Sequence, residues 1–393
     1  MYDNFTAATL AYTKGKPNSM DAYNTVITRD DFTAAMAEIT AWEGYAPTPL
    51  NRLTDLAKSL GLDDILYKDE GLRFGLGSFK ALGGAYAGLR VLQRELMARL
   101  GRSVTMADIR AGIYADEVAK ITLASATDGN HGRSLAWGAR RFGAPCQIYI
   151  HRDVSEGRAQ AMRDLGAIVT RIDGDYDASV DQVRRDADAN GWFVVSDTSW
   201  DGYTQPPTDV MAGYGVMVHE IVQELAEPPT HVFLQGGVGG LAAAVAAGLR
   251  QHWGEASPRV VVVEPELAAC LYESAKAGTP TNVTIEEETL MAGLSCGEPS
   301  PLAWNVLREE AQDFLTIPES IVAPAMRLAG RPVGDDPSIV AGESAVAGFA
   351  AVIAGACQNG LRDALGLSDT SRVLVIGSEG ATDPVIYAQL MTG

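Results

Sequence analysis

Short apolar runs alternate with longer amphipathic stretches along most of the chain, from about residue 65 onward. The runs are rich in β-branched residues and show no polar alternation, which is typical of parallel strands buried on both faces. In the stretches between them, apolar residues recur three or four positions apart, as in helices. The pattern therefore predicts β-α-β units around parallel sheet. The strands that we expect are 119–124, 146–150, 168–172, 192–196, 231–234, 260–263 and 373–376.

One amphipathic stretch starts just after Ser78, which is placed as the N-cap of a helix. Lys80 then falls in the first turn, where its charge opposes the helix dipole. It is either an ordinary exposed lysine or a residue kept there for its chemistry. The apolar stripe that predicts this helix consists of Leu82, Tyr86, Leu89, Leu92, Leu96 and Leu100.

Length and composition favour two lobes over one minimal core. The chain has 393 residues, 47% of them hydrophobic and 21% charged, and shows no repeat or long linker. Two lobes in such a chain must be interwoven rather than strung together. We expect a large lobe of residues 1–117 and 206–393 and a small lobe of residues 118–205.

Charge and sequence spacing exclude several classes of partner. The net charge of −19 disfavours nucleic acid and anionic lipid surfaces. No apolar stretch is long enough to cross a bilayer and no signal peptide is evident, so we expect a cytoplasmic protein. The cysteines and histidines show neither C-x-x-C nor H-x-x-x-H spacing, so we expect no metal.

A glycine-rich loop predicts an anion site. It follows the strand that ends at Leu234 and opens a helix at 241–249, so its N–H groups can close on a phosphate. The same glycines fit a dinucleotide fingerprint, with Glu264 as the acid for a ribose. A nicotinamide-dependent dehydrogenase is therefore an alternative from another class. The loop consists of Gly236, Gly237, Val238, Gly239 and Gly240.

Three further segments resemble that loop in where they lie relative to the predicted strands and helices. They read Gly-Ser-Phe-Lys at 77–80, Ala-Thr-Asp-Gly-Asn-His-Gly at 126–132 and Gly-Ser-Glu-Gly at 377–380. Each is compatible with a plain turn. All of them nevertheless lie at the carboxyl end of a strand or the start of a helix, where open parallel sheets bind ligands. We interpret them as one cofactor site.

These motifs resemble those of fold-type II pyridoxal-phosphate enzymes and, among these, of the diaminopropionate ammonia-lyase family. Asp-Thr-Ser-Trp at 197–200, Met-Ala-Gly-Leu-Ser-Cys-Gly-Glu-Pro at 291–299, Gly-Glu-Ser at 342–344 and Glu-Gly-Ala-Thr-Asp at 379–383 also match, in family order. The resemblance implies an α/β, tryptophan-synthase-β-like fold with two parallel-rich αβα lobes and pyridoxal 5'-phosphate between them. It also implies a homodimer and a small amino acid as substrate.

The resemblance assigns roles to individual residues. Lys80 is the Schiff-base lysine, preceded by Phe79 at the cofactor, and it removes the α-proton of the substrate. Asp128 is a second base on the opposite face, so that D- and L-isomers both react. Asn130 lies beside the ring hydroxyl and Ser378 beside the ring nitrogen. The glycine loop holds the phosphate.

The substrate pocket is assigned in the same way. Asp197 is a candidate to bind the distal ammonium of 2,3-diaminopropionate, which would select an amino leaving group over a hydroxyl. A plain turn residue is the alternative for both Asp128 and Asp197, and a core tyrosine is the alternative for Tyr214. The expected substrate-binding residues are Ser125, Thr127, Asp128, Asp197, Tyr214 and Glu343.

Three departures from the family concern the substrate rather than the cofactor. Residues 77–80 read Gly-Ser-Phe-Lys where Asn-Ala-Phe-Lys is expected, Ala-Val-Ala-Gly follows Ser344, and Ala381 replaces an Asp. We expect elimination of ammonia from diaminopropionate to give pyruvate. A serine, threonine or hydroxyaspartate dehydratase is the alternative within the class, and an inactive pyridoxal-binding regulator is a third.

Overall fold

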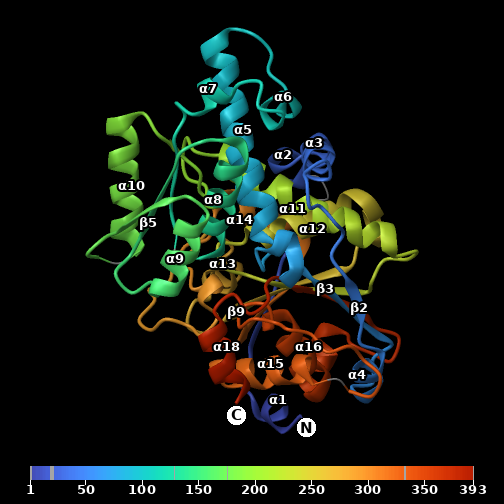
Figure 1. Ribbon diagram of the computed structural model, residues 1–393. Coiled ribbons are helices and arrows are strands. Elements are labelled where there is room, and N and C mark those ends of the chain that lie inside the picture. Colours follow the sequence, from blue (N-terminus) through green and yellow to red (C-terminus); the bar gives the residue numbers. More distant parts are fainter. Residues whose placement is uncertain (1, 18–21, 128, 175, 332, 393) are drawn as a thin grey trace. The chain divides into compact units, whose positions relative to one another are not determined.

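The chain folds into two compact units in a computed structural model that describes residues 2–17, 22–127, 129–174, 176–331 and 333–392 (Figure 1). Unit 1 comprises Met1–Arg29, Ala46–Phe79 and Met217–Gly393, and unit 2 comprises Asp30–Tyr45 and Lys80–Val216. Both units are formed from separate stretches of chain. The division into lobes at 118–205 stays a prediction.

Unit 1 contains a seven-stranded sheet in the order β1-β10-β9-β8-β11-β3-β2. Its five inner strands pair in parallel, and the two edge strands, β1 and β2, are antiparallel to their neighbours. The strands are β1 (Ala11–Lys14), β2 (Leu50–Arg52), β3 (Asp64–Asp69), β8 (His231–Gln235), β9 (Arg259–Pro265), β10 (Ala311–Ile317) and β11 (Arg372–Gly377).

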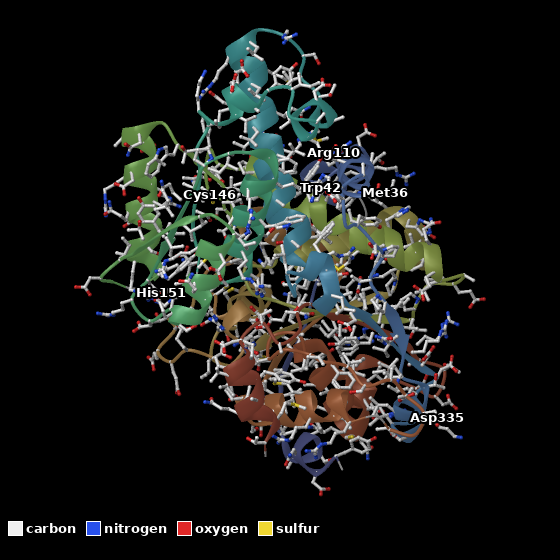
Figure 2. The ribbon with its side chains drawn as sticks, viewed as in Figure 1. Met36, Trp42, Arg110, Cys146, His151 and Asp335 are labelled. Atoms are coloured by element: carbon white, nitrogen blue, oxygen red, sulfur yellow. The ribbon has the colours of Figure 1, made fainter. Side chains whose placement is uncertain are left out.

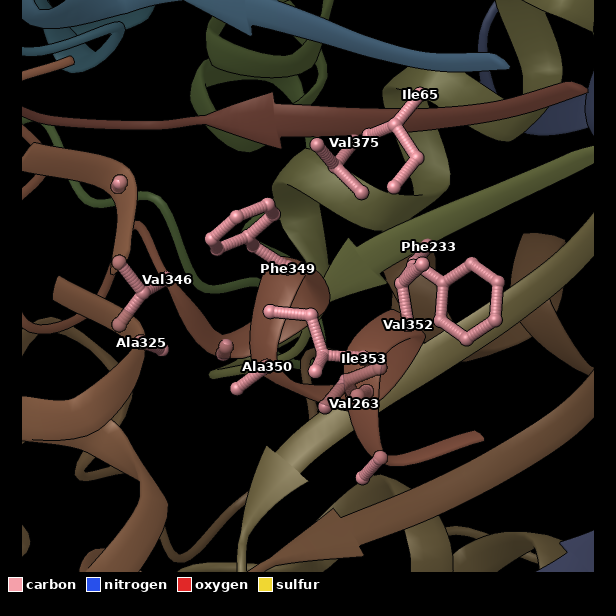
Figure 3. Packing of buried hydrophobic residues seen from close by; sticks show 14 of the residues in the cluster. Ile65, Phe233, Val263, Ala325, Val346, Phe349, Ala350, Val352, Ile353 and Val375 are labelled. Atoms are coloured by element: carbon pink, nitrogen blue, oxygen red, sulfur yellow. The ribbon is translucent and has the colours of Figure 1, made fainter. Parts of the chain in front are cut away.

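Both faces of this sheet are buried, which explains the apolar runs in the sequence. On one face of the sheet, helix α16 (Ala347–Cys357) packs its residue Phe349 against Phe233, Val263 and Val375 (Figure 3). Their chain neighbours Leu234, Val262 and Leu374 are equally buried but point to the other face. Successive side chains of a strand alternate between faces, so burial on both sides requires apolar residues at every position.

Helices cover the sheet of unit 1, and Figure 1 shows α15, α16 and α18 lying together in orange to red. The helices of this unit are α1 (Asp3–Ala7), α2 (Ala22–Val26), α4 (Thr54–Ser59), α12 (Gly240–Trp253), α13 (Cys270–Ala277), α14 (Pro301–Glu310), α15 (Val322–Gly330), α16 (Ala347–Cys357), α17 (Asn359–Leu365) and α18 (Pro384–Met391).

Unit 2 contains a smaller, entirely parallel sheet in the order β6-β5-β4-β7. Its strands are β4 (Leu123–Ala126), β5 (Cys146–Ile150), β6 (Ile168–Arg171) and β7 (Phe193–Val194). Val183 of α10 packs on Ala124 and Tyr149. The helices are α3 (Arg29–Ile39), α5 (Lys80–Leu100), α6 (Met106–Arg110), α7 (Ala115–Val118), α8 (Asn130–Phe142), α9 (Glu156–Asp164), α10 (Tyr176–Asn190) and α11 (Gln205–Glu224), of which α3 and α11 run across the boundary between the units.

The segment 30–45 joins unit 2 through aromatic and charged contacts around Trp42. The Trp42 ring lies 5.7 Å from that of Trp137 in an edge-on arrangement, and its Nε1 donates to Glu38 at 2.8 Å. Arg110 forms an ion pair with the same Glu38, and Figure 2 labels both Trp42 and Arg110. These contacts explain why a segment distant in sequence belongs to this unit.

Three of the expected strands are shorter than predicted, and the one expected at 168–172 ends one residue early, at Arg171. The strand expected at 119–124 begins only at Leu123, because Ala119 ends α7 and its N–H donates to Ala115 at 3.0 Å. The strand expected at 192–196 is limited to Phe193–Val194. Strands β1, β2, β3 and β10 were not among the predicted strands, since their sequences mix polar and apolar residues.

Glycines let three helices of unit 2 approach closely around Lys80. A Cβ on Gly83 would overlap the ring of Tyr214, and one on Gly213 would lie 2.9 Å from the Cα of Gly83. Ala85 N–H donates to the Ser134 hydroxyl at 3.0 Å, which joins α5 to α8. The first turns of α5 are thus fixed by α8 and α11. The predicted helix is confirmed, but it begins at Lys80 rather than directly after Ser78, which forms an isolated β-bridge with Glu379 instead of capping the helix.

A buried ion cluster, consisting of Lys68, Glu70, Arg73 and Glu220, anchors the chain that leads to Phe79. Arg73 donates to Glu70 at 2.7 and 2.8 Å and to Glu220 at 2.7 and 2.8 Å. Lys68 donates to Glu220 at 2.6 Å. Burial alone would lower the pKa of Arg73 but the two carboxylates raise it, and the Arg73 and Lys68 charges lower the pKa of Glu220 to about 2.

Two classes of site have no structural basis within the described ranges. None of the helices there combines the length and the apolar character that crossing a membrane requires. Nor do three or more His, Cys, Asp or Glu side chains of those ranges gather in a way that would hold a metal ion.

Candidate active site

Lys80 and Asp197 are in contact in unit 2, although 117 residues separate them. Lys80 is the first residue of α5, and its Nζ donates to Oδ2 of Asp197, which lies in the loop after β7. Each side chain is 20% exposed. The reactive amine that the sequence predicts is therefore reachable from solvent and rests against a carboxylate. We call Lys80, Asp197, His131 and Tyr214 the lysine site.

Asp197 is held in its ionised form. Burial alone would raise its pKa, but the charge of Lys80 and the hydrogen bond from Lys80 together hold the pKa below its ordinary value. A carboxylate in this state binds ammonium groups by charge-assisted hydrogen bonds. In unit 2 Asp197 binds the Lys80 amine, and its contact with the distal ammonium of a substrate stays a prediction.

His131 lies beside the same carboxylate. Its Nε2 is 2.9 Å from the carbonyl oxygen of Val195, and since a carbonyl only accepts, Nε2 carries the proton. Its Nδ1 lies 3.9 Å from Oδ2 of Asp197. Burial lowers the pKa of His131, so the ring is neutral and presents an unprotonated nitrogen toward Asp197.

Tyr214 completes the lysine site from α11. It is fully buried, and its ring centroid lies 6.0 Å from Nζ of Lys80. Burial raises the pKa of Tyr214, although the Lys80 charge acts in the opposite direction. The phenol therefore stays protonated and its ring packs against the cation.

The predicted loop after β4 lies in unit 2 as well. Ser125 ends up fully buried within β4, and in the described part of the chain its hydroxyl has no hydrogen-bond partner. The Thr127 hydroxyl accepts weakly from Gly129 N–H at 3.4 Å, and Asn130 begins α8. Asp128 lies outside the described residues, so its role as a second base stays a prediction.

The glycine loop of unit 1, which we call the anion turn (Gly236–Gly240), links β8 to α12. Gly239 has φ +97°, a left-handed conformation that disfavours any other residue. A Cβ on Gly236 would lie 2.8 Å from Leu271, and one on Gly237 would lie 3.2 Å from the Cys296 sulfur. The turn therefore has a tight, glycine-dependent shape that opens a helix N-terminus, as an anion site requires.

Ser378 directly follows β11 and is oriented by Gln235. Nε2 of Gln235 donates to Oγ of Ser378 at 3.0 Å and to the carbonyl of Ile376 at 2.7 Å. The hydroxyl hydrogen of Ser378 is then left to donate to an acceptor such as a ring nitrogen. Phe79 N–H donates to the carbonyl of Ser378 at 3.0 Å, which ties the residue before Lys80 to the same strand exit.

Glu343 lies in a segment that is held against the end of β11. Gly342 N–H donates to the carbonyl of Glu379 at 3.0 Å, and Ser344 N–H donates to its side chain at 3.3 Å. Glu343 itself is 2% exposed. The structure thus places Glu343 near the exit of β11 in unit 1, and its contact with substrate stays a prediction.

Glu264 is not available to a ribose. Its carboxylate accepts from Leu271 N–H at 2.8 Å and from Tyr272 N–H at 2.6 Å, in the first turn of α13. The side chain is fully buried, and burial raises the pKa of Glu264 to about 8. It is engaged in holding a helix start, which removes the acid that the dehydrogenase alternative needs.

Two residues of the site were missed by sequence reasoning. Gln235 is a polar residue at the end of an otherwise apolar strand, and that position was a signal available in the sequence. His131 belongs to a quoted motif but was not assigned a role. His131 contacts Val195 and Asp197, which lie 64 and 66 residues further along the chain, and no local sequence pattern reveals contacts at such separations.

The described residues fit pyridoxal phosphate. The anion turn offers a helix N-terminus shaped by glycines that a Cβ would fill, and Ser378 has a hydroxyl hydrogen free of its bond to Gln235. Lys80 supplies an amine at a partly exposed position. Unit 1 thus offers the anion turn for the phosphate and Ser378 for the ring nitrogen. Unit 2 offers the Lys80 amine for the aldehyde.

Comparisons with known proteins agree with this fit. Residues 41–379 match the model of the pyridoxal-phosphate dependent enzyme family. Diaminopropionate ammonia-lyase of Escherichia coli strain K12 is 40% identical over 354 residues, which are 88% of each chain. The crystal structure of the E. coli enzyme with D-serine superposes with a TM-score of 0.88 at 35% identity, covering 98% of both chains. Its complex with an aminoacrylate–pyridoxal phosphate azomethine intermediate gives a TM-score of 0.86 at 34% identity.

The extent of these matches identifies the fold and the cofactor. The fold-type II architecture and pyridoxal phosphate, both expected from the sequence, are confirmed. Because the identity to the E. coli lyase extends over most of both proteins, this chain belongs to the diaminopropionate ammonia-lyase family of pyridoxal-phosphate dependent enzymes.

Proposed function

We propose that this chain eliminates ammonia from 2,3-diaminopropionate in both its D and L forms. The β-amino group leaves as ammonia, and the resulting aminoacrylate takes up one water to give pyruvate and a second ammonia. The observation that carries the proposal is the contact between the Asp197 carboxylate and the amine of Lys80. A carboxylate that binds one ammonium at the reactive lysine is suited to bind the distal ammonium of this substrate.

Lys80 moves the α-proton in this proposal. Bound pyridoxal phosphate supplies the electron sink that makes this proton acidic. The Lys80 amine would accept that proton from one face of the substrate. The close packing around Gly83 fixes the start of α5 and therefore the backbone from which this side chain extends.

Asp197 distinguishes an amino from a hydroxyl leaving group. Its lowered pKa keeps it ionised throughout the neutral range, so an ammonium on the β-carbon gains a charge-assisted bond that a hydroxyl group does not. His131 presents an unprotonated nitrogen toward Asp197 and adds no full positive charge that would compete with the substrate.

The remaining predicted residues hold the cofactor and the substrate carboxylate. The anion turn would receive the phosphate, Ser378 the ring nitrogen and Asn130 the ring hydroxyl. The buried hydroxyl of Ser125, with Thr127, is suited to the substrate carboxylate. Tyr214 and Glu343 would line the pocket.

Asp128 is proposed as the base for the D-isomer. We expect Asp128→Asn to lose turnover of the D-isomer selectively and to keep most of the turnover of the L-isomer. Steady-state assays with each pure isomer measure this difference. Equal loss of both activities would remove Asp128 from the two-base scheme.

Steady-state assays on four substrates test the proposed function. Diaminopropionate is expected to have a higher kcat/KM than serine, threonine and hydroxyaspartate, with pyruvate and two ammonia formed per turnover. A preference for one of the hydroxy substrates would make the protein a dehydratase. A holoenzyme that turns over none of the four would support the regulator alternative.

Assembly and location are further proposals. We propose a homodimer, which the resemblance of the motifs implies, and a cytoplasmic location. Light scattering on the holoenzyme, eluted from a size-exclusion column, measures the assembly. A mass of about 83 kDa, twice 41.6 kDa, is the expected result, and a mass of one chain would contradict it.

A further inference from the structure

The carboxylate of Asp197 is carried by a segment with little support from the sheet. Strand β7 consists only of Phe193 and Val194, and the last bond to its neighbour is Val195 N–H to Ala124 at 2.8 Å. Asp197 therefore lies beyond the end of the ladder. Something other than the sheet must fix its backbone.

The hydroxyl of Tyr203 fixes this backbone from two sides. It donates to the carbonyl of Val194 at 2.9 Å and accepts from the N–H of Ser196 at 2.9 Å. One oxygen thus closes the bend around Val195, immediately before Asp197. Burial raises the pKa of Tyr203, so the phenol keeps the proton that it donates.

The ring of Tyr203 is itself fixed by a stack. It lies parallel to Trp200 with centroids 3.8 Å apart and an interplanar angle of 8°. The guanidinium of Arg184, from α10, lies 4.1 Å from the centre of the Trp200 ring. Trp200 and Tyr203 also exchange backbone hydrogen bonds of 3.2 and 2.9 Å across a turn in which Gly202 has φ +80°.

The same bend serves His131. Its Nε2 donates to the carbonyl of Val195, which is the residue enclosed by the two bonds of Tyr203. A shift of this bend would therefore move Asp197 and change the contact of His131 together. A displacement of about 1 Å at such a site is enough to reduce turnover by up to roughly 10²-fold.

We propose that Tyr203 is a positioning residue for the elimination, and that its hydroxyl, braced by the stack on Trp200 and Arg184, holds the Asp197 carboxylate where the substrate's distal ammonium binds. This inference rests on the proposed function, since it assigns Tyr203 to the amine-selecting group of the same site. No substrate atom needs to contact Tyr203.

Tyr203→Phe removes the hydroxyl and keeps the stacked ring. We expect kcat/KM for diaminopropionate to fall about tenfold. The value for serine should change less than about threefold, because serine has no distal ammonium for Asp197 to bind. The ratio of the two values is the readout, since a loss of fold or of cofactor would lower both equally. An unchanged ratio would overturn the proposal.

Tyr149→Phe is the matched control. Tyr149 is a buried tyrosine of the same unit, and its hydroxyl donates to Asp186 at 2.5 Å, away from the Asp197 segment. The ratio should stay at the wild-type value in this variant. Arg184→Met provides a second variant in case Tyr203→Phe folds poorly. It weakens the stack without touching either hydroxyl bond, and a smaller fall in the same ratio is expected.

A double-mutant cycle separates this inference from the proposed function. In the Asp197→Asn background, Tyr203→Phe should have little further effect, because the group that it positions is already lost. Full additivity on the substrate that the wild type prefers would overturn the positioning role. Wild-type preference for serine would instead reject the ammonia-lyase function and, with it, the amine-selecting role that Tyr203 is assigned through Asp197.

Discussion

Two lysines of this protein bind carboxylates in opposite ways. Lys68 is fully buried, and its amine donates to Glu220 and to the carbonyl of Thr48, both at 2.6 Å. Lys80 binds Asp197, and both of these side chains are partly exposed. Glu220 is held by Arg73 in addition to Lys68, whereas His131 beside Asp197 is neutral.

The difference separates structure from chemistry. In the buried ion cluster two cations balance two carboxylates, so removing any member leaves an uncompensated charge in the interior. The lysine site is one ion pair within reach of solvent, and in the proposed function the distal ammonium of the substrate takes the place of Lys80 at Asp197. We infer that a lysine amine is available for covalent chemistry when its ion pair is partly exposed, because it can then leave its partner carboxylate.

The largest expected effect is that of Lys80→Ala. It removes the amine that we propose as the group that binds the cofactor and accepts the α-proton, so turnover should fall by roughly 10³-fold or more. The melting temperature of the apoprotein should fall less than in Arg73→Ala, because the Lys80–Asp197 pair is partly exposed and Asp197 keeps access to solvent. Lys276→Ala, at an exposed ion pair with Glu273, is the control and should keep wild-type turnover. Appreciable activity in Lys80→Ala would erase the contrast between the two lysines.

Arg73→Ala should show the opposite profile. It leaves Glu70 and Glu220 buried with one cation fewer, which costs about 3–5 kcal/mol of unfolding free energy. Urea unfolding measures the loss. The matched control is Arg372→Ala, which breaks an exposed pair with Glu227 and should cost about 1 kcal/mol or less. Similar losses in the two variants would show that burial does not distinguish the cluster.

Acid should weaken the cluster within a defined range of pH. The pKa of Glu220 is lowered to about 2 from an ordinary value of 4.5, so the unfolded chain binds the proton more tightly than the folded protein. The stabilisation by ionised Glu220, roughly 3 kcal/mol, is complete above about pH 4.5 and is lost as the pH falls toward 2. The gap in unfolding free energy between wild type and Glu220→Gln should close over this range, and a constant gap would refute this account.

Asp197→Asn tests whether the carboxylate of the lysine site serves catalysis rather than stability. It keeps the shape of the side chain and removes the charge, so kcat/KM for diaminopropionate should fall by roughly 10²-fold. The value for serine should fall less, since only the amino substrate uses that charge. Loss of stability as large as in Arg73→Ala would mean that Asp197 is a structural residue after all.

Local pattern predicted most of the elements that carry or adjoin the candidate site residues of each unit. The apolar strands β5, β8, β9 and β11, the helix that contains Lys80 and the glycine turn were all expected from the sequence. Each depends on residues close together in the chain, through burial, capping or backbone conformation. Edge strands β1 and β2 escaped prediction because, among the described strands, each pairs on one side alone, and their sequences are correspondingly mixed.

Contacts across long separations escaped prediction for a different reason. The pairing of Lys80 with Asp197, the bond of His131 to Val195 and the cluster around Glu220 join residues 64 to 152 positions apart. Family resemblance supplied Lys80 and Asp197 as site residues. It did not supply Tyr203 or Gln235, whose roles depend on hydrogen bonds that only the three-dimensional arrangement defines.

The identity of the lysine that carries the cofactor tests the account most directly. Borohydride reduction of the holoenzyme fixes the cofactor to its lysine, and peptide mass spectrometry then locates it. The account predicts the added mass on the peptide that contains Lys80 and none on the peptide that contains Lys68. Label on Lys68, or on any lysine other than Lys80, would contradict it.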